Sequence, residues 1–564
     1  MEIPTGRLPQ RWFVGEVRAA WAAAGGDALL ALFVVILGWK MTYGLGHVLD
    51  IELGDESYYL RAGLDFFRHR PAADWSPLYD FVYWLLAHRF HDPVAVYMAN
   101  QELQTVLLPA ALFLCLRAVG VGRLPALLLS AYFLISAADL PIWPKPMHFA
   151  MTVLLLFLVA FFRLRASPAR IPLLLLGAGI ASMIRPEFLI AFGLLACVLA
   201  YELVRRGSKA LRALYAILCL VPVAILFLHF GVPFSNQRSF AAFTDHFVMN
   251  YAHAHRIVGD AEPLAPSIMR ATFGSAHDVL AAARANPGAF LWHVGTNLAH
   301  FPRQLASLVL GHYDLVTPRS HFFALLEAAL AGLLALGFLY RVRGRIAFER
   351  ARLASTDMAC LACLAAPVLI SVLLVAPRIH YVMGFEVLLV VALAFVLRFE
   401  RGAPATPLRR LAVPCLALLV AVPSLGSLYY FMNGPPSALA VTPRPILETV
   451  EYLRSLKGPG PLVVCESFTG AIDAYLGPGA RSISIVGKRG LPVSDLIAKE
   501  GIDVFVVDDA FRSRQVLDSV PGLAQLIADP ARLGFRRHRL EDSNDVILVS
   551  DKFTPASAPG AEGG

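Results

Sequence analysis

Long apolar runs separated by short polar connections dominate the first 430 positions of the chain. A helix needs roughly 20 mostly apolar residues to cross a hydrocarbon core about 30 Å thick. Runs that approach this length lie at about 28–48, 94–116, 124–140, 147–162, 171–184, 188–202, 213–230, 322–340, 358–376, 379–397 and 411–430. The pattern therefore predicts a polytopic α-helical membrane protein with about 11 transmembrane helices.

The pattern changes after residue 430, where short β-branched runs alternate with helix-like stretches. Strands are expected at 461–467, 481–486, 502–509 and 545–551, and helices at 446–455 and 516–527. Such alternation is typical of a small α/β fold. We therefore expect a transmembrane domain over 1–430, an extracytoplasmic α/β domain over 431–552, and a disordered Pro- and Gly-rich tail over 553–564.

The composition agrees with a membrane protein. The chain of 564 residues has a mean hydropathy of +0.61, with 57% hydrophobic and only 16% charged residues. A net charge of +8 on a soluble protein would suggest a nucleic-acid partner, but here the Lys and Arg residues fall in short clusters between apolar runs. No basic stripe interleaved with aromatic residues is present, so a nucleic-acid partner is not expected.

The distribution of basic residues predicts the orientation. Alternate short connections carry two to five Lys or Arg each, whereas the connections between them, such as 185–187 and 377–378, carry one. By the positive-inside rule the N-terminus is cytoplasmic. The loops 50–93 and 231–321 and the C-terminal domain are then exported, as expected for a multi-pass protein of the bacterial cytoplasmic (inner) membrane.

An acidic stretch, D-I-E-L-G-D-E-S-Y-Y at 50–59, directly follows the first apolar run. Asp55 and Glu56 are adjacent and so point in different directions, and only one of them can face a given reacting group. A carboxylate there can take the proton from an incoming hydroxyl. The alternative is that these acids only solvate an exported loop. The next loop segment, W-S-P-L-Y at 75–79, is expected to anchor at the membrane interface.

Three cations, each beside a proline, recur on the same predicted side of the membrane: Lys145, Arg185 and Arg378. Any one of them alone can bind a lipid headgroup. Together they can hold a phosphate, and the two arginines offer bidentate geometry. An acid opposite a phosphate clamp suggests transfer from a phosphorylated, membrane-embedded donor.

The acidic loop with D-E-S-Y-Y-L-R-A-G, the segment G-A-G-I-A-S-M-I-R-P-E and A-P-R-I-H-Y together resemble the GT-C superfamily of polyprenyl-phosphate-sugar glycosyltransferases. Within it, the protein O-mannosyltransferase and aminoarabinose transferase group is most similar, over roughly residues 10–400. The resemblance implies that Asp55, with Glu56 beside it, and Asp139 are catalytic. It implies phosphate contacts at Lys145, Arg185 and Arg378, although Ile379 and His380 separate Arg378 from Tyr381 where the family often has Arg-Tyr. Further substrate contacts are expected at Tyr58, His148, Glu187, His380 and Tyr381.

The expected activity is inverting transfer of a hexosyl or pentosyl group from a polyprenyl-phosphate-linked donor to an exported glycan, glycolipid or protein. Two alternatives are a transporter or flippase for lipid-linked saccharides and a non-catalytic envelope assembly protein. No cofactor is expected. His246, His253 and His255 are a weaker candidate for a metal site because their spacing is irregular. Lys40, inside the first apolar run, either snorkels to the exported face or faces the site.

Overall fold

The computed structural model describes most of the chain. The described residues are 10–47, 49–68, 71–136, 138–139, 143–205, 209–233, 238–257, 264–310, 355–397, 444–467, 471–488, 490–540 and 545–555. They belong to two compact units. The helical unit comprises Met1–Tyr43, Leu103–Pro141 and Pro146–Met432, and the second unit comprises Gly44–Glu102, Ile142–Lys145 and Asn433–Gly564.

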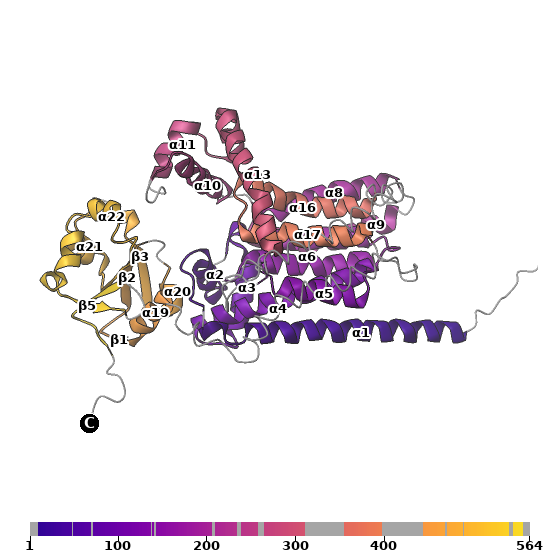
Figure 1. Ribbon diagram of the computed structural model, residues 1–564, viewed down its shortest axis with the longest axis horizontal. Helices are drawn as coiled ribbons and strands as arrows, with labels where there is room; N and C mark the ends of the chain where they lie inside the picture. Colours follow the sequence, from indigo (N-terminus) through magenta and orange to yellow (C-terminus); the bar gives the residue numbers. More distant parts are fainter. Residues whose placement is uncertain are drawn as a thin grey trace, which may run out of the picture. The chain divides into compact units, whose positions relative to one another are not determined.

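The helical unit is built from helices packed side by side, with a further group of helices at one end (Figure 1). The side-by-side set consists of α1 (Gln10–Thr42), α4 (Pro93–Val119), α5 (Arg123–Leu134), α6 (Pro146–Arg163), α7 (Arg170–Ser182), α8 (Phe188–Arg205), α9 (Lys209–Phe230), α16 (Thr356–Leu374) and α17 (Ile379–Leu397). The remaining set is α10 (Arg238–Ala254), α11 (Ala265–Phe273), α12 (Val279–Ala285) and α13 (Pro287–Leu310). In sequence, α10 to α13 occupy the predicted exported segment 231–321, and Phe243, Phe247 and Phe273 form the core of this small helical group.

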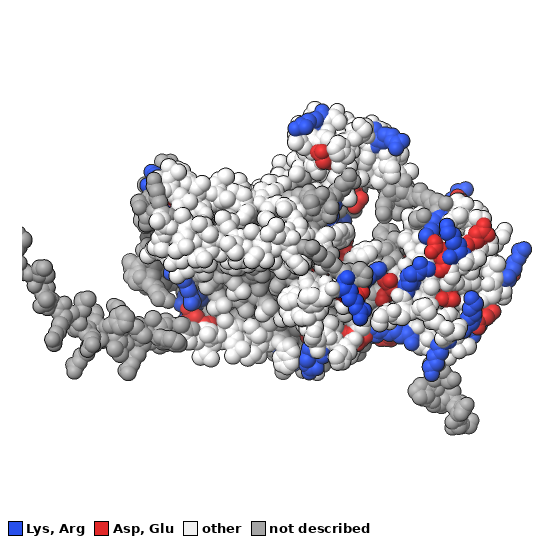
Figure 2. All heavy atoms as spheres, turned by 180° about the vertical axis from the view of Figure 1, so that it is seen from behind, with Lys and Arg blue, Asp and Glu red and all other residues white. Residues whose placement is uncertain are grey.

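Most of the side-by-side helices have the length of membrane spans. Among the described residues, six helices are long and apolar enough to cross a membrane: Gly25–His47, Pro93–Val119, Pro146–Arg163, Phe188–Arg205, Ala210–Phe230 and Thr356–Leu374. Large apolar side chains of α9, including Ile217 and Leu228, are exposed, as lipid-facing residues are. Figure 2 shows a broad uncharged surface along this unit. The chain is a multi-pass membrane protein.

Nine of the eleven predicted spans coincide with described helices, and the other two, 322–340 and 411–430, lie outside the described residues. The span expected at 124–140 is shorter than predicted, because α5 ends at Leu134. There the hydroxyl of Ser136 donates a hydrogen bond to the carbonyl of Phe133, in competition with the helical pattern. Twelve residues of helix rise only about 18 Å, so α5 is too short to cross the hydrocarbon core by itself.

The second unit contains the first predicted exported loop and the C-terminal α/β domain. The loop forms α2 (Asp55–Leu64) and α3 (Pro77–Ala87). The domain contains α19 (Pro445–Ser455), β1 (Leu456–Lys457), β2 (Leu462–Glu466), α20 (Asp473–Leu476), β3 (Ala480–Ser484), α21 (Val493–Glu500), β4 (Val504–Val507), α22 (Arg514–Ser519), α23 (Leu523–Ala528), β5 (Phe535–Arg539), β6 (Val546–Ser550) and β7 (Thr554–Pro555).

A mixed five-stranded sheet in the order β3-β2-β4-β6-β5 forms the centre of the C-terminal domain. Strand β2 pairs in parallel with β3 and β4, whereas β6 pairs antiparallel with β4 and β5. All four residues of β4 are buried, as expected of a central strand covered on both faces. The strand β5 reads F-R-R-H-R, and such charged residues protect the edge of a sheet. This lack of apolar alternation is why the sequence pattern missed β5.

The four predicted strands and the first predicted helix of this domain are confirmed, but the helix expected at 516–527 is wrong in its continuity. The chain leaves helix α22 at Val520 and re-enters helix α23 after Gly522, whose φ of 82° lies in the left-handed region. Pro521 also removes a backbone donor at this point. In the predicted tail, Thr554 and Pro555 pair with β1, so order extends further than expected, and 556–564 lies outside the described residues.

The first acid of the stretch 50–59 has a structural partner in the C-terminal domain. The carboxylate of Asp50 accepts the backbone N–H groups of Ile446 at 3.0 Å and of Leu447 at 2.8 Å, in the first turn of α19. The N–H groups of a first helical turn have no acceptor within their own helix, and a carboxylate placed there also suits the helix dipole. Asp50 therefore caps α19 from a distant part of the chain.

Replacing Asp50 with Ala is expected to lower stability by about 1 kcal/mol, the usual effect of losing a capping side chain. The measurement is the midpoint of thermal unfolding of the full chain in detergent. Asp509→Ala is the matched control, because the Asp509 side chain is 92% exposed in its ion pair with Arg512. Equal midpoints for Asp50→Ala and the wild type would contradict the capping role.

Candidate functional site

The acidic stretch becomes helical at Asp55 because several local interactions favour a helix start. The N–H of Gly54 donates to Ser57 Oγ at 3.1 Å, and the same hydroxyl donates to the Gly54 carbonyl at 2.8 Å. Asp55 lies in the first turn, where a negative charge suits the helix dipole. Asp55 is exposed, whereas Glu56 is only 1% exposed. The predicted divergence of the two carboxyl groups is confirmed.

Glu56 is enclosed by side chains of α3. The hydroxyl of Tyr79 donates to Glu56 Oε1 at 2.6 Å, and the hydroxyl of Tyr83 donates to the same oxygen. Asn100 Nδ2 in turn donates to Tyr79 Oη at 2.9 Å. Among the described residues, Glu56 Oε2 has no hydrogen-bond partner.

Burial raises the pKa of Glu56 to about 8, because a buried carboxylate loses its hydration. The two tyrosine hydroxyls and the charge of Lys145 act in the opposite direction and only partly offset this effect. Glu56 is therefore mainly protonated at pH 7. One carboxyl of the adjacent pair is neutral and buried, and the other is open to solvent.

Lys145 lies beside these acids. Its Nζ is 3.9 Å from Glu52 Oε1, and it sits over the ring of Trp143, 4.4 Å from the centroid. Glu52 Oε2 accepts the backbone N–H of Glu56 at 3.1 Å, so the same carboxylate contacts both the start of α2 and the lysine. The Tyr475 hydroxyl also donates to the backbone carbonyl of Glu52 at 2.6 Å. The second unit thus holds an exposed acid, a buried acid and a cation within one short region.

Tyr58, another predicted contact, follows on the same helix. Its ring is half-buried and meets the edge of Trp75 at a centroid distance of 6.2 Å. The guanidinium of Arg61 lies 5.6 Å from the Tyr58 ring centroid, and Arg61 also pairs with Asp473 at 2.9 Å. Trp75 is 40% exposed, but Tyr79 is fully buried, so the interfacial role expected for W-S-P-L-Y does not extend to its tyrosine.

In the helical unit, two of the quoted motifs meet. Arg185 Nη2 lies 2.8 Å from Glu187 Oε1, and its Nε donates to the same oxygen at 2.9 Å. The Arg185 guanidinium also lies over the ring of Tyr381, 5.0 Å from its centroid. The turn between α7 and α8 therefore lies beside the start of α17. A single predicted site that contains Arg185, Glu187 and Tyr381 requires this contact.

Arg378 lies in the connection between α16 and α17, and it is exposed. The pKa of His246, in α10, is lowered to about 3. Burial is the main cause, and the positive charge of Arg378 nearby adds to it. The histidine is therefore neutral at pH 7. His380 adjoins the Tyr381 ring at a centroid distance of 4.2 Å.

A polar network supports the connection that carries Arg378. Asn297 Nδ2 donates to the carbonyls of Leu373 at 2.9 Å and Val375 at 3.2 Å, and His293 Nε2 lies 3.1 Å from the carbonyl of Leu374. Asn250 Nδ2 contacts His293 Nδ1 and Asn297 Oδ1, each at 3.0 Å. These contacts satisfy the carbonyls at the end of α16, which the helix itself leaves unpaired. His293 and Asn297, four residues apart on α13, are both buried, whereas His300 is exposed.

Asp139 is fully buried in the connection between α5 and α6. Neither of its carboxyl oxygens has a hydrogen-bond partner among the residues that the structure describes, and burial raises its pKa well above the ordinary value. His148 is also buried, with Nε2 3.0 Å from the carbonyl of Ala138. Asp139 and His148 thus belong to one buried corner of the helical unit.

The histidines expected as a weaker metal site, and Lys40, remain to be placed. Within the described ranges, no group of three or more His, Cys, Asp and Glu side chains could hold a metal ion. His246 is buried, while His253 and His255 are exposed. Lys40 is near the end of α1, with its Nζ 5.5 Å from the Tyr43 ring centroid, which favours the snorkelling interpretation.

The sequence pattern missed several polar partners: Glu52 as the lysine partner, Tyr79 and Tyr83 as donors to Glu56, and Asn250 in the network beside Arg378. The spacing of Tyr79 and Tyr83 was a usable signal, because residues four apart share one helical face. The other partners are far apart in sequence, and no local pattern reveals them.

No protein-family model and no curated protein match the chain. Solved structures do match. One is the oligosaccharyltransferase AglB from Archaeoglobus fulgidus in complex with an inhibitory peptide and a dolichol-phosphate, with 13% identity, 94% of this chain and 74% of that chain covered, and a TM-score of 0.47. Another is ArnT from Cupriavidus metallidurans bound to undecaprenyl phosphate, with 11% identity, 93% and 98% covered, and a TM-score of 0.48.

The same ArnT in the apo state matches with 14% identity, 95% of this chain and 99% of that chain covered, and a TM-score of 0.40.

Glu56 gives the protein a predicted pH dependence. Its pKa is about 8 when folded against a reference of 4.5, so between these values the folded state binds a proton that the unfolded state releases. Stability is therefore expected to fall as pH rises from about 5 to 8. Gln cannot titrate, so Glu56→Gln should flatten this dependence.

The measurement is the unfolding midpoint of both proteins at several pH values in one detergent. Glu448→Gln, on the first turn of α19, is a control for loss of a carboxylate elsewhere in the same unit. A wild-type slope that persists unchanged in Glu56→Gln would show that other groups cause it.

Proposed function

We propose that this protein is a membrane glycosyltransferase that moves a sugar from a polyprenyl-phosphate-linked donor to an exported acceptor. The observation that carries the proposal is the region around the start of α2. There, one compact unit combines an exposed carboxylate at Asp55, a neutral buried carboxyl at Glu56 and a cation at Lys145, 3.9 Å from Glu52.

Asp55 is the proposed general base. Its side chain is exposed, so an acceptor hydroxyl can approach it, whereas Glu56 is enclosed by Tyr79 and Tyr83. Proton transfer to a positioned carboxylate contributes typically 10²- to 10⁴-fold to a rate. We assign Glu56 a positioning role on α2, in place of the catalytic role expected from the sequence, because its carboxyl is fully buried.

The proposed reaction balances as a single displacement. The acceptor oxygen forms a bond to the anomeric carbon of the donor and loses its proton to Asp55. The bond from that carbon to the phosphate oxygen breaks, and its electron pair leaves on the polyprenyl phosphate. Attack opposite the leaving group inverts the anomeric configuration. The positive charge of Lys145 favours the negative charge that develops on the departing phosphate.

Arg378 and Arg185 are the proposed additional phosphate contacts, and their settings differ. Arg185 is already paired with Glu187 at 2.8 Å. Arg378 is exposed, and the described residues offer it no ion-pair partner, so its guanidinium can bind a phosphate without first breaking an ion pair. Asp139, whose pKa burial raises well above the ordinary value, is proposed as the second acid that the resemblance implies. We propose the bacterial cytoplasmic membrane as the location, with the C-terminal domain exported.

The test is sugar transfer in liposomes with a panel of radiolabelled polyprenyl-phosphate sugars and exported acceptors. Asp55→Asn should reduce transfer by roughly 10²-fold or more, because the amide cannot accept the proton. Arg378→Ala should reduce it by about tenfold or more through a lost charged contact. Asp65→Asn is the matched control, since Asp65 at the other end of α2 contacts only Arg68, at 3.6 Å, among the ion pairs found.

Full activity of Asp55→Asn would remove the proposed base. Binding or bilayer crossing of the lipid-linked sugar without any transfer by the wild type would instead support a transporter. In that case the acidic region and the cations would only bind the headgroup of the lipid-linked sugar and would not catalyse transfer.

A further inference from the structure

The segment that leads into α2, residues 49–53, forms neither a helix nor a strand. Leu49 and Ile51 are nevertheless buried. A buried irregular segment must find partners for its backbone groups elsewhere in the chain. Because this segment directly precedes α2, the contacts that hold it also set the position of Asp55, the proposed base.

The C-terminal domain supplies one of these partners. The hydroxyl of Tyr475, in α20, donates to the carbonyl of Glu52 at 2.6 Å, although the two residues are 423 positions apart. Tyr475 is fully buried, and its ring meets the edge of the Tyr97 ring at a centroid distance of 5.8 Å. A buried tyrosine hydroxyl needs a hydrogen-bond partner, so this contact favours one position of the Glu52 backbone.

A second contact comes from the same short helix. Asp473 pairs with Arg61 of α2 at 2.9 Å. Glu52 precedes Asp55 in the chain, and Arg61 follows it on α2. Helix α20 therefore contacts the chain on both sides of the proposed base.

Helix α20 is itself fixed to the sheet of the C-terminal domain. Glu466, the last residue of β2, accepts the backbone N–H groups of Ala471 and Ile472 at 2.6 and 3.0 Å, just before α20. The second carboxylate oxygen of Asp473 accepts the N–H of Ser482, in β3, at 3.3 Å. Side chains held in this way by two parallel strands are placed more precisely than side chains on a free loop.

Three further contacts join the first exported loop to the C-terminal domain. Asp50 caps α19, Arg444 donates to the carbonyl of Gly46 at 3.0 Å, and Arg454 pairs with Asp92 at 2.6 Å. The loop and the domain are therefore one structural unit, although most of the chain separates them in sequence.

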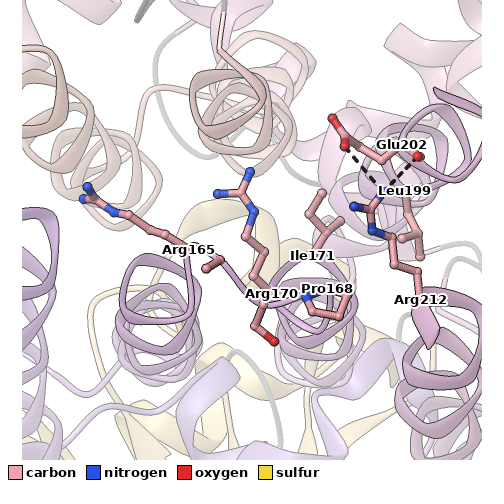
Figure 3. A pocket seen from close by; sticks show the side chains of 9 residues that line it. Arg165, Pro168, Arg170, Ile171, Leu199, Glu202 and Arg212 are labelled. Atoms are coloured by element: carbon pink, nitrogen blue, oxygen red, sulfur yellow. Dashed lines mark hydrogen bonds and ion pairs between the residues drawn. The ribbon is translucent and has the colours of Figure 1, made fainter. Parts of the chain in front are cut away.

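The ion pairs of the helical unit have a different effect. Figure 3 shows a pocket of about 90 Å³ in that unit, lined by Arg165, Arg170, Glu202 and Arg212, among others. Arg212 lies 3.9 Å from Glu202, and Arg170 lies 2.8 Å from Asp357. These ion pairs link helices of one bundle, whereas the contacts of α20 link a separate domain to the segment that carries Asp55.

We propose that α20 is a positioning element of the transfer site, in which the Tyr475 hydroxyl and the Asp473 carboxylate fix the start of α2 and thereby the place of Asp55. The inference rests on the proposed glycosyltransferase function, and it gives the C-terminal domain a part in catalysis. Both residues act through α2 and the segment before it, so they are positioning residues. Misplacing a catalytic group by about 1 Å can lower a rate about 10²-fold.

The test measures sugar transfer in liposomes by the full-length variants Tyr475→Phe and Asp473→Asn. Each change removes one contact and keeps the shape of the side chain. Each should lower kcat by about tenfold and leave the KM for the donor within about twofold, because a displaced base slows the reaction without weakening donor binding. Tyr452→Phe is the matched control, since it removes a hydroxyl from the same domain at a ring that stacks on His538.

A double variant separates positioning from a general loss of folded enzyme. If Tyr475 acts through Asp55, then Asp55→Asn combined with Tyr475→Phe should transfer sugar at the rate of Asp55→Asn alone. A general loss would multiply, and the double variant would be about tenfold slower again.

Hydrogen exchange of residues 50–64, measured on the full-length protein in detergent, needs no donor. Exchange should be about fivefold faster in Tyr475→Phe than in the wild type, the effect of one lost hydrogen bond between neutral groups. Tyr452→Phe should exchange at the wild-type rate in this segment.

Full transfer activity of Tyr475→Phe would overturn the inference, even if exchange became faster. A further loss in the double variant, or an equal loss in Tyr452→Phe, would also overturn it. Absence of transfer by the wild type with every donor would remove the proposed function instead. In that case, faster exchange in Tyr475→Phe would still support the positioning of α2 by α20, and unchanged exchange would overturn it.

Discussion

A membrane interior offers no hydrogen-bond partner to a peptide group, and this constraint organises the helical unit. Each span must satisfy its own backbone, so the chain crosses as helices and its chemically versatile side chains collect where helices end. Arg185 lies between α7 and α8, Arg378 lies between α16 and α17, and Asp139 lies between α5 and α6. The positions of these groups are therefore determined by helix length and connection.

Helix ends also have unpaired backbone groups, and the protein satisfies them in two ways. Where no ligand is required, side chains bind them: Asp50 accepts two N–H groups of α19, and Asn297 donates to two carbonyls at the end of α16. At the start of α7 a nearby residue does the same: Ser167 Oγ accepts the N–H of Ala169 at 3.2 Å, and the Ser167 carbonyl accepts the N–H of Arg170 at 3.5 Å. Helix ends are thus capped both by neighbouring residues and by residues distant in the chain.

Burial separates the roles of adjacent carboxyl groups. Asp55 and Glu56 have nearly identical chemistry, but the helix turns one toward solvent and the other toward Tyr79 and Tyr83. The loss of hydration keeps Glu56 neutral near pH 7, where the tyrosine hydroxyls stabilise its position without a second charge. The acidic stretch consequently combines one titratable structural group with one accessible acid.

The sequence by itself determined the membrane class, nine of the spans now seen as helices, and the strands β2, β3, β4 and β6, because apolar periodicity reports burial directly. It also named Arg185, Glu187 and Tyr381, which do meet. Only the tertiary structure decided that Tyr79 and Tyr83 donate to Glu56, that Lys145 faces Glu52, and that Arg165 and Arg212 share a pocket. These pairs are distant in the chain or distributed over separate helix ends, and periodicity within one segment carries no information about which segments pack together.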